Sequence, residues 1–313
     1  MLGFVLKRLV GLIPVIAVVS IVVFLLLRLS PGDPAVVIAG DNADAATIER
    51  IRASLGLDQP LINQFFIWIG SLLRGDMGMS IFSNIPVTQL IFQRIEPTAS
   101  LALTTLIFSL LIAIPLGTIA GATAGSWLDR SLMLVSVLGF SIPAFVLGYC
   151  LIYIFSLQLK LLPVQGFVSI RQGIGPFISS IALPTMTLGL AYLVLIARIT
   201  RASVLEMMGE DFIRTARAKG VKERLVVTRH ALRNSAIPIL TVIGIGVALL
   251  ISGVVVIETV FNIPGVGRLV VDAILKRDYP VIQGVILMFS AVYVLVNLAI
   301  DIGYAFLDPR VRY

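Results

Sequence analysis

The sequence predicts an all-α integral membrane protein with six transmembrane helices, and two observations support this prediction. The chain of 313 residues is 58% hydrophobic and 13% charged, with a mean hydropathy of +1.04. That composition cannot supply the charged, mixed surface of a soluble domain. Six runs also lack Asp, Glu, Lys and Arg, and a helix of roughly 20 apolar residues crosses a bilayer core. The runs are Leu9–Leu27, Pro97–Leu128, Ser131–Leu159, Gln172–Ala197, Asn234–Ile257 and Tyr279–Ile300.

The first run resembles a signal peptide, because Lys7 and Arg8 precede it. Its 19 residues exceed the apolar region of about 7–15 residues that signal peptides carry. No small-residue cleavage pattern follows before the turn-rich "SPGDP" of residues 30–34. We therefore expect residues 1–30 to form an N-terminal anchor helix that is retained.

The charges between the runs predict the orientation. Six spans place both termini on one side, and basic residues accumulate on the cytoplasmic side. One side receives the segment 198–234, with nine Lys/Arg against four Asp/Glu. It also receives Lys7, Arg8, Arg130, Arg310 and Arg312. The other side receives residues 31–96, where seven acidic residues outnumber four basic ones. Both termini are therefore expected to be cytoplasmic.

Residues 31–96 are expected to form an outer segment with short helices. Within it, "QPLINQFFIWIGSLL" (59–73) is uncharged for only 15 residues and is rich in aromatic side chains. It is too short to span a bilayer comfortably. Two placements remain open for this predicted helix: at the membrane surface, or packed on the helical bundle.

Residues 97–313 are expected to form the transmembrane core, which contains the basic loop 198–234. Ser203 and Glu206 have the S-x-x-E spacing of a helix-capping box. Asp211 is predicted to cap a helix over residues 212–219, and Gly220 fits the position that ends it. A second helix is expected over 221–234, running back to the fifth span.

The predicted helix at 212–219 has two possible roles. A basic loop can serve only to set the topology. However, the small residues Thr215 and Ala216 allow another protein to approach closely, and Arg214 and Arg217 offer hydrogen-bonding forks. These features favour a docking helix for a cytoplasmic partner.

Within the predicted spans, prolines and glycines indicate kinks and close helix contacts. They include Pro115, Gly117, Pro143, Gly148, Pro184, Gly189, Gly244 and Gly246.

Two stretches of the loop, "RTARAKG" (214–220) and "RHALRNSAIP" (229–238), resemble the cytoplasmic loop of ABC-importer permeases. In that family a short coupling helix sits in a groove of the ATPase subunit. The usual pattern is Glu-Ala-Ala, three residues, then Gly. Gly220 and Ala216 match it, whereas Arg214 and Thr215 replace the Glu and the first Ala.

Further motifs resemble the first permease subunit of the dipeptide/oligopeptide/nickel family. They are "SPGDP" (30–34), "LGLDQP" (55–60), "GDMGMS" (75–80), "ETVFNIPGVGRLVVDAILKRDYPVIQG" (258–284) and "NLAIDIGYAFLDPR" (297–310). The resemblance implies a type I importer permease fold in a bacterial inner membrane. It also implies ATP-driven uptake of peptides or similar small solutes. The ATPase-coupling residues would be Asp211, Arg214, Thr215, Ala216, Arg217, Ala218, Lys219 and Gly220.

The same resemblance implies the partners. They are a homologous second permease forming a heterodimer, two ABC ATPases, an extracytoplasmic substrate-binding protein and membrane lipid, with no nucleic acid. No cofactor is expected in this chain, because the ATPases would bind ATP and Mg²⁺. Consistent with this, the sequence has no G-x-x-x-x-G-K-[ST] motif to hold nucleotide phosphates.

Alternatives to an ABC permease are an ion-coupled secondary transporter or a membrane scaffold without transport activity. Ion-coupled carriers usually place ionisable groups inside the membrane. Here the candidate groups, Glu258 and Asp301, lie at the ends of uncharged runs. An enzyme is also disfavoured, because one cysteine (Cys150) and one histidine (His230) cannot supply a conventional zinc site.

Overall fold

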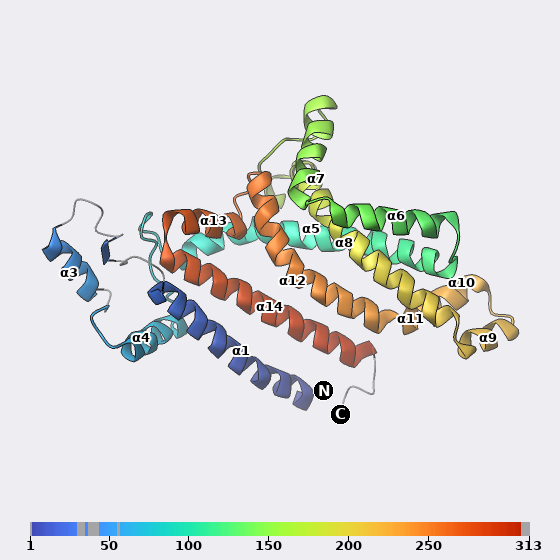
Figure 1. Ribbon diagram of the computed structural model, residues 1–313, viewed down its shortest axis with the longest axis horizontal. Coiled ribbons are helices and arrows are strands. Elements are labelled where there is room, and N and C mark those ends of the chain that lie inside the picture. The colour runs from blue at the N-terminus through green and yellow to red at the C-terminus, as the bar shows by residue number, and fades with distance from the viewer. Residues whose placement is uncertain (1, 30–34, 37–43, 55–56, 308–313) are drawn as a thin grey trace. The chain divides into compact units, whose positions relative to one another are not determined.

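The computed structural model describes residues 2–29, 35–36, 44–54 and 57–307, and the elements in this part of the chain are helical (Figure 1). The long helices are α1 (Leu2–Leu29), α5 (Val87–Ala122), α8 (Ile174–Met208), α12 (Ala236–Val260) and α14 (Tyr279–Leu307). The helices of intermediate length are α3 (Ala45–Ser54), α4 (Leu61–Leu73), α6 (Trp127–Ser141), α7 (Ala144–Leu151), α9 (Asp211–Ala218) and α13 (Val266–Lys276). Short helical segments are η1 (Ile152–Gln158), η2 (Ile170–Gln172), α10 (Glu223–Leu225), η3 (Val226–Ala231) and α11 (Leu232–Asn234). The predicted turn at 30–34 and the basic residues Arg310 and Arg312 lie outside the described residues.

The chain divides into two compact units. Unit 1 comprises residues 1–10, 95–268 and 292–313, and unit 2 comprises residues 11–94 and 269–291. Each unit is described separately below.

Among the described residues, four helices are long and apolar enough to cross a membrane, namely α5, α8, α12 and α14. A fifth span results if α6 and the α7–η1 helix count as one bent span. Helix α1 contains the first uncharged run, but the apolar part described in it, Val10–Leu25, is shorter than these spans. The all-helical membrane fold is thus confirmed, whereas the number six stays a prediction.

The predicted third span is not one straight helix. Helix α6 ends at Ser141, and the following helix is bent from it by 103°. Ile142 between them is extended, with φ −96° and ψ 120°. Pro143 explains this break, because proline lacks an N–H group and disfavours helical geometry in the residue before it.

Two helices extend beyond their uncharged runs. Helix α5 begins at Val87, inside the predicted outer segment, and α8 continues to Met208, inside the predicted loop 198–234. The proposed capping box at Ser203 and Glu206 is therefore wrong, because both residues lie within α8. The S-x-x-E spacing also suits the interior of a helix, where i and i+3 side chains are neighbours.

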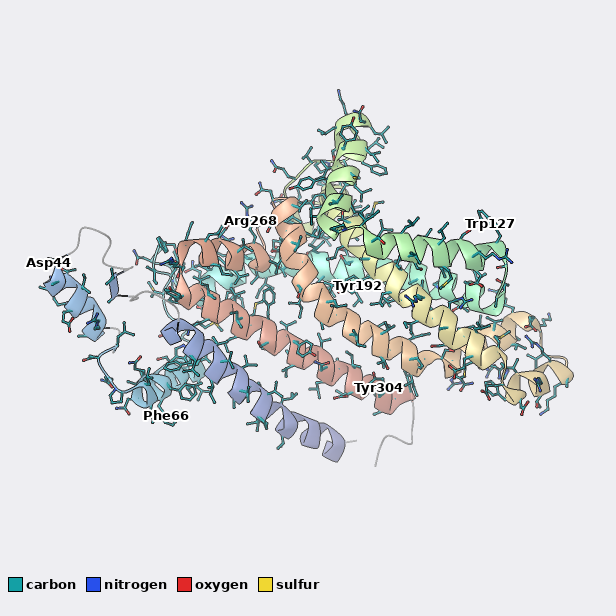
Figure 2. The ribbon with its side chains drawn as sticks, in the orientation of Figure 1. Asp44, Phe66, Trp127, Tyr192, Arg268 and Tyr304 are labelled. Carbon is teal, nitrogen blue, oxygen red and sulfur yellow. The ribbon has the colours of Figure 1, made fainter. Side chains whose placement is uncertain are left out.

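In unit 1, α8 is the most buried helix and packs against α6, α7 and α12. Its Tyr192 (labelled in Figure 2) is buried, and the tyrosine hydroxyl donates a hydrogen bond to the Gly246 carbonyl oxygen of α12. Between α5 and α8, the Thr104 and Thr185 hydroxyls are 2.8 Å apart. The Ser109 hydroxyl donates to the Gly189 carbonyl at 3.0 Å. Uncharged hydroxyl and backbone groups thus join the central helices.

The predicted close helix contacts occur between α5 and α8. A Cβ atom added to Gly117 would lie 2.5 Å from the Ala197 carbonyl oxygen. A Cβ added to Gly121, one turn later, would lie 2.7 Å from the Arg201 carbonyl oxygen. These two glycines let the α5 backbone touch the α8 backbone, as small residues do in membrane helix pairs.

In unit 2, the end of α1 is held by two neighbours. The Phe24 ring packs on Phe65 and Trp68 of α4, with centroid separations of 5.3 and 5.7 Å. The Gln283 side chain of α14 donates a hydrogen bond to the Val23 carbonyl at 3.1 Å. The buried Asp278, directly before α14, accepts hydrogen bonds from the Ser80 hydroxyl at 2.5 Å and the Ile81 amide at 3.1 Å.

The α5–α8 contact gives a first prediction. Gly117→Ala should destabilise the protein by about 1–3 kcal/mol, because the added methyl group overpacks the contact. The control is Gly175→Ala in α8, where no atom lies within 4 Å of the added Cβ. Thermal unfolding in detergent measures both. Equal midpoints for Gly117→Ala and Gly175→Ala would contradict the tight α5–α8 contact.

Candidate functional site

The candidate coupling site is α9, which lies on a small hydrophobic core formed by the loop itself. This core, here called the α9 platform, consists of five buried residues from α8, α9 and η3: Val204, Ile213, Ala216, Val226 and Ala231. Figure 1 shows α9, α10 and α11 gathered at one end of α8 and α12. The sequence between Gly209 and Ser235 therefore forms a packed structure rather than a loose basic loop.

Helix α9 is ended by Gly220 as predicted, although its last helical residue is Ala218, one before the predicted residue 219. Gly220 has a φ of +75°, in the left-handed region that glycine adopts without strain. The Gly220 amide donates to the Arg217 carbonyl at 2.9 Å, and the Val221 amide donates to the Ala216 carbonyl at 3.2 Å. This pair of bonds is a Schellman motif, which satisfies carbonyls at the end of the helix.

The start of α9 differs from the prediction by one residue. Asp211 is the first helical residue, and the preceding Glu210 occupies the cap position with extended backbone and no side-chain cap. The Asp211 carboxylate instead pairs with Arg214 one turn along, at 3.3 Å. An acidic residue in the first turn still complements the helix dipole.

Ala216 has a different position from the one expected. It is 7% exposed and packs within the α9 platform together with Ile213, so it cannot form the close contact with a partner that its small size suggested. The other seven predicted coupling residues are exposed: Asp211, Arg214, Thr215, Arg217, Ala218, Lys219 and Gly220. The helical period explains why Ala216 is buried: it lies three residues after Ile213, so the two side chains share the buried face of α9.

Arg217 is held by an acidic partner within the loop. Its guanidinium donates to the two Glu223 carboxylate oxygens at 2.6 and 3.1 Å, joining the end of α9 to α10. This hydrogen bond from Arg217 lowers the pKa of Glu223 below its ordinary value of 4.5. The pair closes the short connection between the two helices.

A second ion pair, which the sequence analysis did not identify, joins α8 to the start of α6. Arg201 contacts the buried Asp129 carboxylate at 2.6 and 2.9 Å, and Asp129 also accepts a hydrogen bond from the Gly125 amide at 2.9 Å. The turn between α5 and α6 is thereby attached to the part of α8 that leads into the α9 platform. No spacing rule connects positions 72 residues apart, so only the folded structure reveals this pair.

At the other end of α12, the fully buried Glu258 lies under the turn that follows the helix. The Thr98 hydroxyl of α5 donates to one carboxylate oxygen at 2.6 Å, and the Arg268 amide donates to the other at 2.8 Å. The Thr98 oxygen in turn accepts from the Val266 amide at 2.8 Å. We call this network of Thr98, Glu258, Val266 and Arg268 the Glu258 cluster; Arg268 is labelled in Figure 2.

Two glycines of the "NIPGVG" turn make room for this carboxylate. A Cβ atom on Gly265 would lie 2.1 Å from one Glu258 carboxylate oxygen, and one on Gly267 would lie 2.9 Å from the other. The turn is thereby packed closely on the Glu258 side chain. The sequence analysis placed Glu258 at the end of a span and did not predict its burial; the nearby Gly265 and Gly267 were the signal that could have indicated it.

Other bonds tie the segment 159–173 to the same end of unit 1. The Ser169 hydroxyl donates to the Glu96 carboxylate of α5, and the Gly166 amide donates to the Phe261 carbonyl at 2.9 Å. The Glu258 cluster and the α9 platform lie at opposite ends of α12. The 25 residues of α12, rising about 1.5 Å each, separate them by roughly 37 Å. Helix α12 is long and apolar enough to span a membrane.

No group of three or more His, Cys, Asp or Glu residues in the described part of the chain is arranged to hold a metal ion.

Comparison with known families decides the identity of this architecture. Residues 113–313 match the family described as binding-protein-dependent transport system inner membrane component, and residues 1–104 match its N-terminal region. The chain belongs to this family. The suggested resemblance to ABC-importer permeases is confirmed.

Two relatives align with the chain over nearly its whole length. A probable peptide ABC transporter permease protein of Sinorhizobium fredii is 51% identical over 310 residues, 99% of each chain. The glutathione transport system permease protein GsiC of Escherichia coli (strain K12) is 46% identical over 313 residues, 100% of each chain.

The fold is also similar to that of a known transporter. A chain from inward-facing structures of the MetNI methionine ABC transporter matches with a TM-score of 0.58 and 18% identity, covering 70% of this chain and 97% of that one. At that identity the match establishes the fold alone. Together with the family, it shows that the chain is a multi-pass membrane permease subunit of an ABC importer, whose ATPase is a separate subunit.

The Arg217–Glu223 pair gives a prediction on pH. Because the pKa of Glu223 is lowered in the folded chain, its stabilising effect is present above pH 4.5 and is lost as the pH falls through the lowered value. Both side chains are partly exposed, so the contribution should be at most about 1 kcal/mol. Glu223→Gln should therefore speed amide hydrogen exchange in α9 slightly at neutral pH, and the difference should vanish in acid.

The control for this exchange measurement is Glu206→Gln, which removes an exposed carboxylate on α8. If α9 exchanges equally fast in Glu223→Gln, Glu206→Gln and the wild type at neutral pH, the pair does not hold α9.

The Glu258 cluster gives a further prediction. Thr98→Val removes the hydroxyl that serves both Glu258 and the Val266 amide, which should cost about 1–3 kcal/mol because buried polar groups lose a partner. Thr98→Ser keeps the hydroxyl and should restore most of the stability. Thermal unfolding and limited proteolysis at 262–268 measure the effect. Indistinguishable behaviour of the Val and Ser variants would show that the hydroxyl is not needed.

Proposed function

We propose that this permease is one of two homologous subunits that together form the pathway of an ATP-driven importer, with a peptide or similar small solute as cargo. The functions named for its relatives, peptide and glutathione transport, support this class of cargo. The uncharged spans support a path lined by backbone and neutral polar groups. Such a path leaves most of the selectivity to a separate binding protein.

The observation that carries the proposal is the construction of α9. Ile213 and Ala216 occupy the α9 platform, while Arg214, Thr215 and Ala218 face outward from a helix whose C-terminal end is fixed by Gly220. A short, supported helix with an exposed polar face suits insertion into a groove of another protein. We assign ATPase coupling to this exposed face, with Ala216 supporting it from within.

The α9 platform also supports a route for the coupled movement. It includes Val204 of α8 and Ala231, five residues before α12 begins. A displacement of α9 by a closing ATPase would reach both helices through packed side chains, because close-packed interiors transmit strain. Those helices extend to the opposite face, where the Glu258 cluster fixes the end of α12.

The proposed assembly contains this chain, the second permease, two ABC ATPases and an extracytoplasmic binding protein. ATP and Mg²⁺ would be bound by the ATPases, with no cofactor in this chain. The excess of basic residues at 198–234 supports a cytoplasmic α9 and cytoplasmic termini. The opposite face, with residues 31–96 and the loop 258–278, would then meet the binding protein.

Bulky substitutions on the exposed face of α9 test the docking role. Thr215→Trp and Ala218→Trp should overpack a close contact and cost about 1–3 kcal/mol, a loss of roughly 5- to 150-fold in affinity for the ATPase. Arg214→Ala should cost less, because an exposed ion pair contributes about 0–1 kcal/mol. Copurification of ATPase activity at equal membrane level measures each variant.

The matched control is Ala45→Trp, which adds the same bulk at an exposed position of α3. Full ATPase copurification with both α9 tryptophan variants would mean that the segment is only a basic topology loop. Ala216→Trp would not discriminate, because that change disrupts the α9 platform itself.

A further inference from the structure

Helix α4 has an apolar face that its neighbours in unit 2 do not cover. Ile62, Phe66 and Leu73 are 69%, 66% and 83% exposed, and they form one stripe because four and seven residues separate them along the helix. Figure 2 labels Phe66 on this helix. The 13 residues of α4 include no charged side chain. A single exposed apolar side chain is ordinary, but a continuous uncharged stripe marks an interaction surface.

The opposite side of α4 fixes where this stripe lies. Phe65 and Trp68 pack on Phe24 of α1, and the buried Gln64 donates hydrogen bonds to the Leu57 and Gln59 carbonyls at 3.3 and 2.8 Å. The ring contacts hold this side of α4 against α1, so the apolar stripe is turned away from α1. The stripe therefore faces whatever medium surrounds the end of α1.

That medium can be identified from the depth of α1. Phe24 lies four residues before Arg28, which ends the uncharged run 9–27. At about 1.5 Å per residue, Phe24 is roughly 6 Å from the edge of the apolar span. The Gln283–Val23 hydrogen bond indicates a similar depth in the membrane from another helix. Gln283 lies five residues after Asp278, the charged residue that directly precedes the last uncharged run.

We propose that α4 lies in the boundary of the bilayer, with Ile62, Phe66 and Leu73 inserted among the lipids on the side where α1 ends. Its length is about 20 Å, too short to cross the membrane, and its aromatic residues are of the kind enriched at membrane interfaces. Helix α1 in the same unit also exposes apolar side chains, including Val18 and Val22. In this proposal the two placements that the sequence left open both apply: one face of α4 packs on α1, and the other lies at the membrane surface.

Collision accessibility of spin labels tests this inference in the assembled transporter in lipid nanodiscs. Single cysteines replace Ile62, Phe66 or Leu73 in a Cys150→Ser background. Val18→Cys on α1 serves as the lipid-exposed control and Glu49→Cys on α3 as the water-exposed control. The labels on α4 should have an oxygen-to-nickel-chelate accessibility ratio close to that of Val18→Cys and several-fold above that of Glu49→Cys.

Two outcomes overturn the proposal. High access to the chelate, as at Glu49→Cys, would place the stripe in water. Low access to both reagents would mean that another protein covers it, such as the second permease or the binding protein. Three label sites keep the test valid if one variant does not assemble. Because the measurement needs neither ATP nor cargo, its failure is distinct from failure of the proposed coupling role of α9.

Discussion

The exclusion of charge from the spans determines much of this structure. An ionised group inside a bilayer needs a partner or a water-filled cavity, and the buried acidic residues lie near helix ends. Among the described residues, the buried acidic side chains are Asp129, Glu258 and Asp278. Each lies at or beside the end of a helix and accepts a backbone amide from a neighbouring turn. Backbone N–H groups in the first turn of a helix lack a partner within the helix. A carboxylate that accepts a hydrogen bond from a backbone N–H group forms a strong, charge-assisted bond.

The two ends of unit 1 use different interactions for this purpose. At one end, the α9 platform holds a short helix on an apolar core, and ion pairs connect the surrounding segments. At the other end, Glu258 fixes a glycine-containing turn through hydrogen bonds. Helices α8 and α12 run between the two ends through an interior joined by hydroxyl and backbone groups and by tight glycine contacts. This combination suits a permease, in which a movement at one membrane face must be transmitted to the other.

The sequence predicted the features that depend on local chemistry or on long runs. The uncharged runs located the helices, and Gly220 ended α9 as expected, because a C-terminal glycine has a local structural cause. The sequence indicated a kink at Pro143 but not its size of 103°, since a break within an apolar run changes neither its length nor its charge. It also assigned Ala216 to the wrong surface, because small size indicates close packing without saying what lies against the residue. The Asp129–Arg201 pair depends on tertiary packing alone.

The central claim is that this chain moves its cargo by coupling to a separate ATPase through α9. The most direct test reconstitutes the assembled transporter in liposomes and measures solute uptake with ATP supplied on the side that α9 faces. The account predicts uptake that requires ATP, the ATPase subunits and the binding protein, and that an ion gradient cannot replace. Uptake driven by an ion gradient through this chain without the ATPase would contradict it.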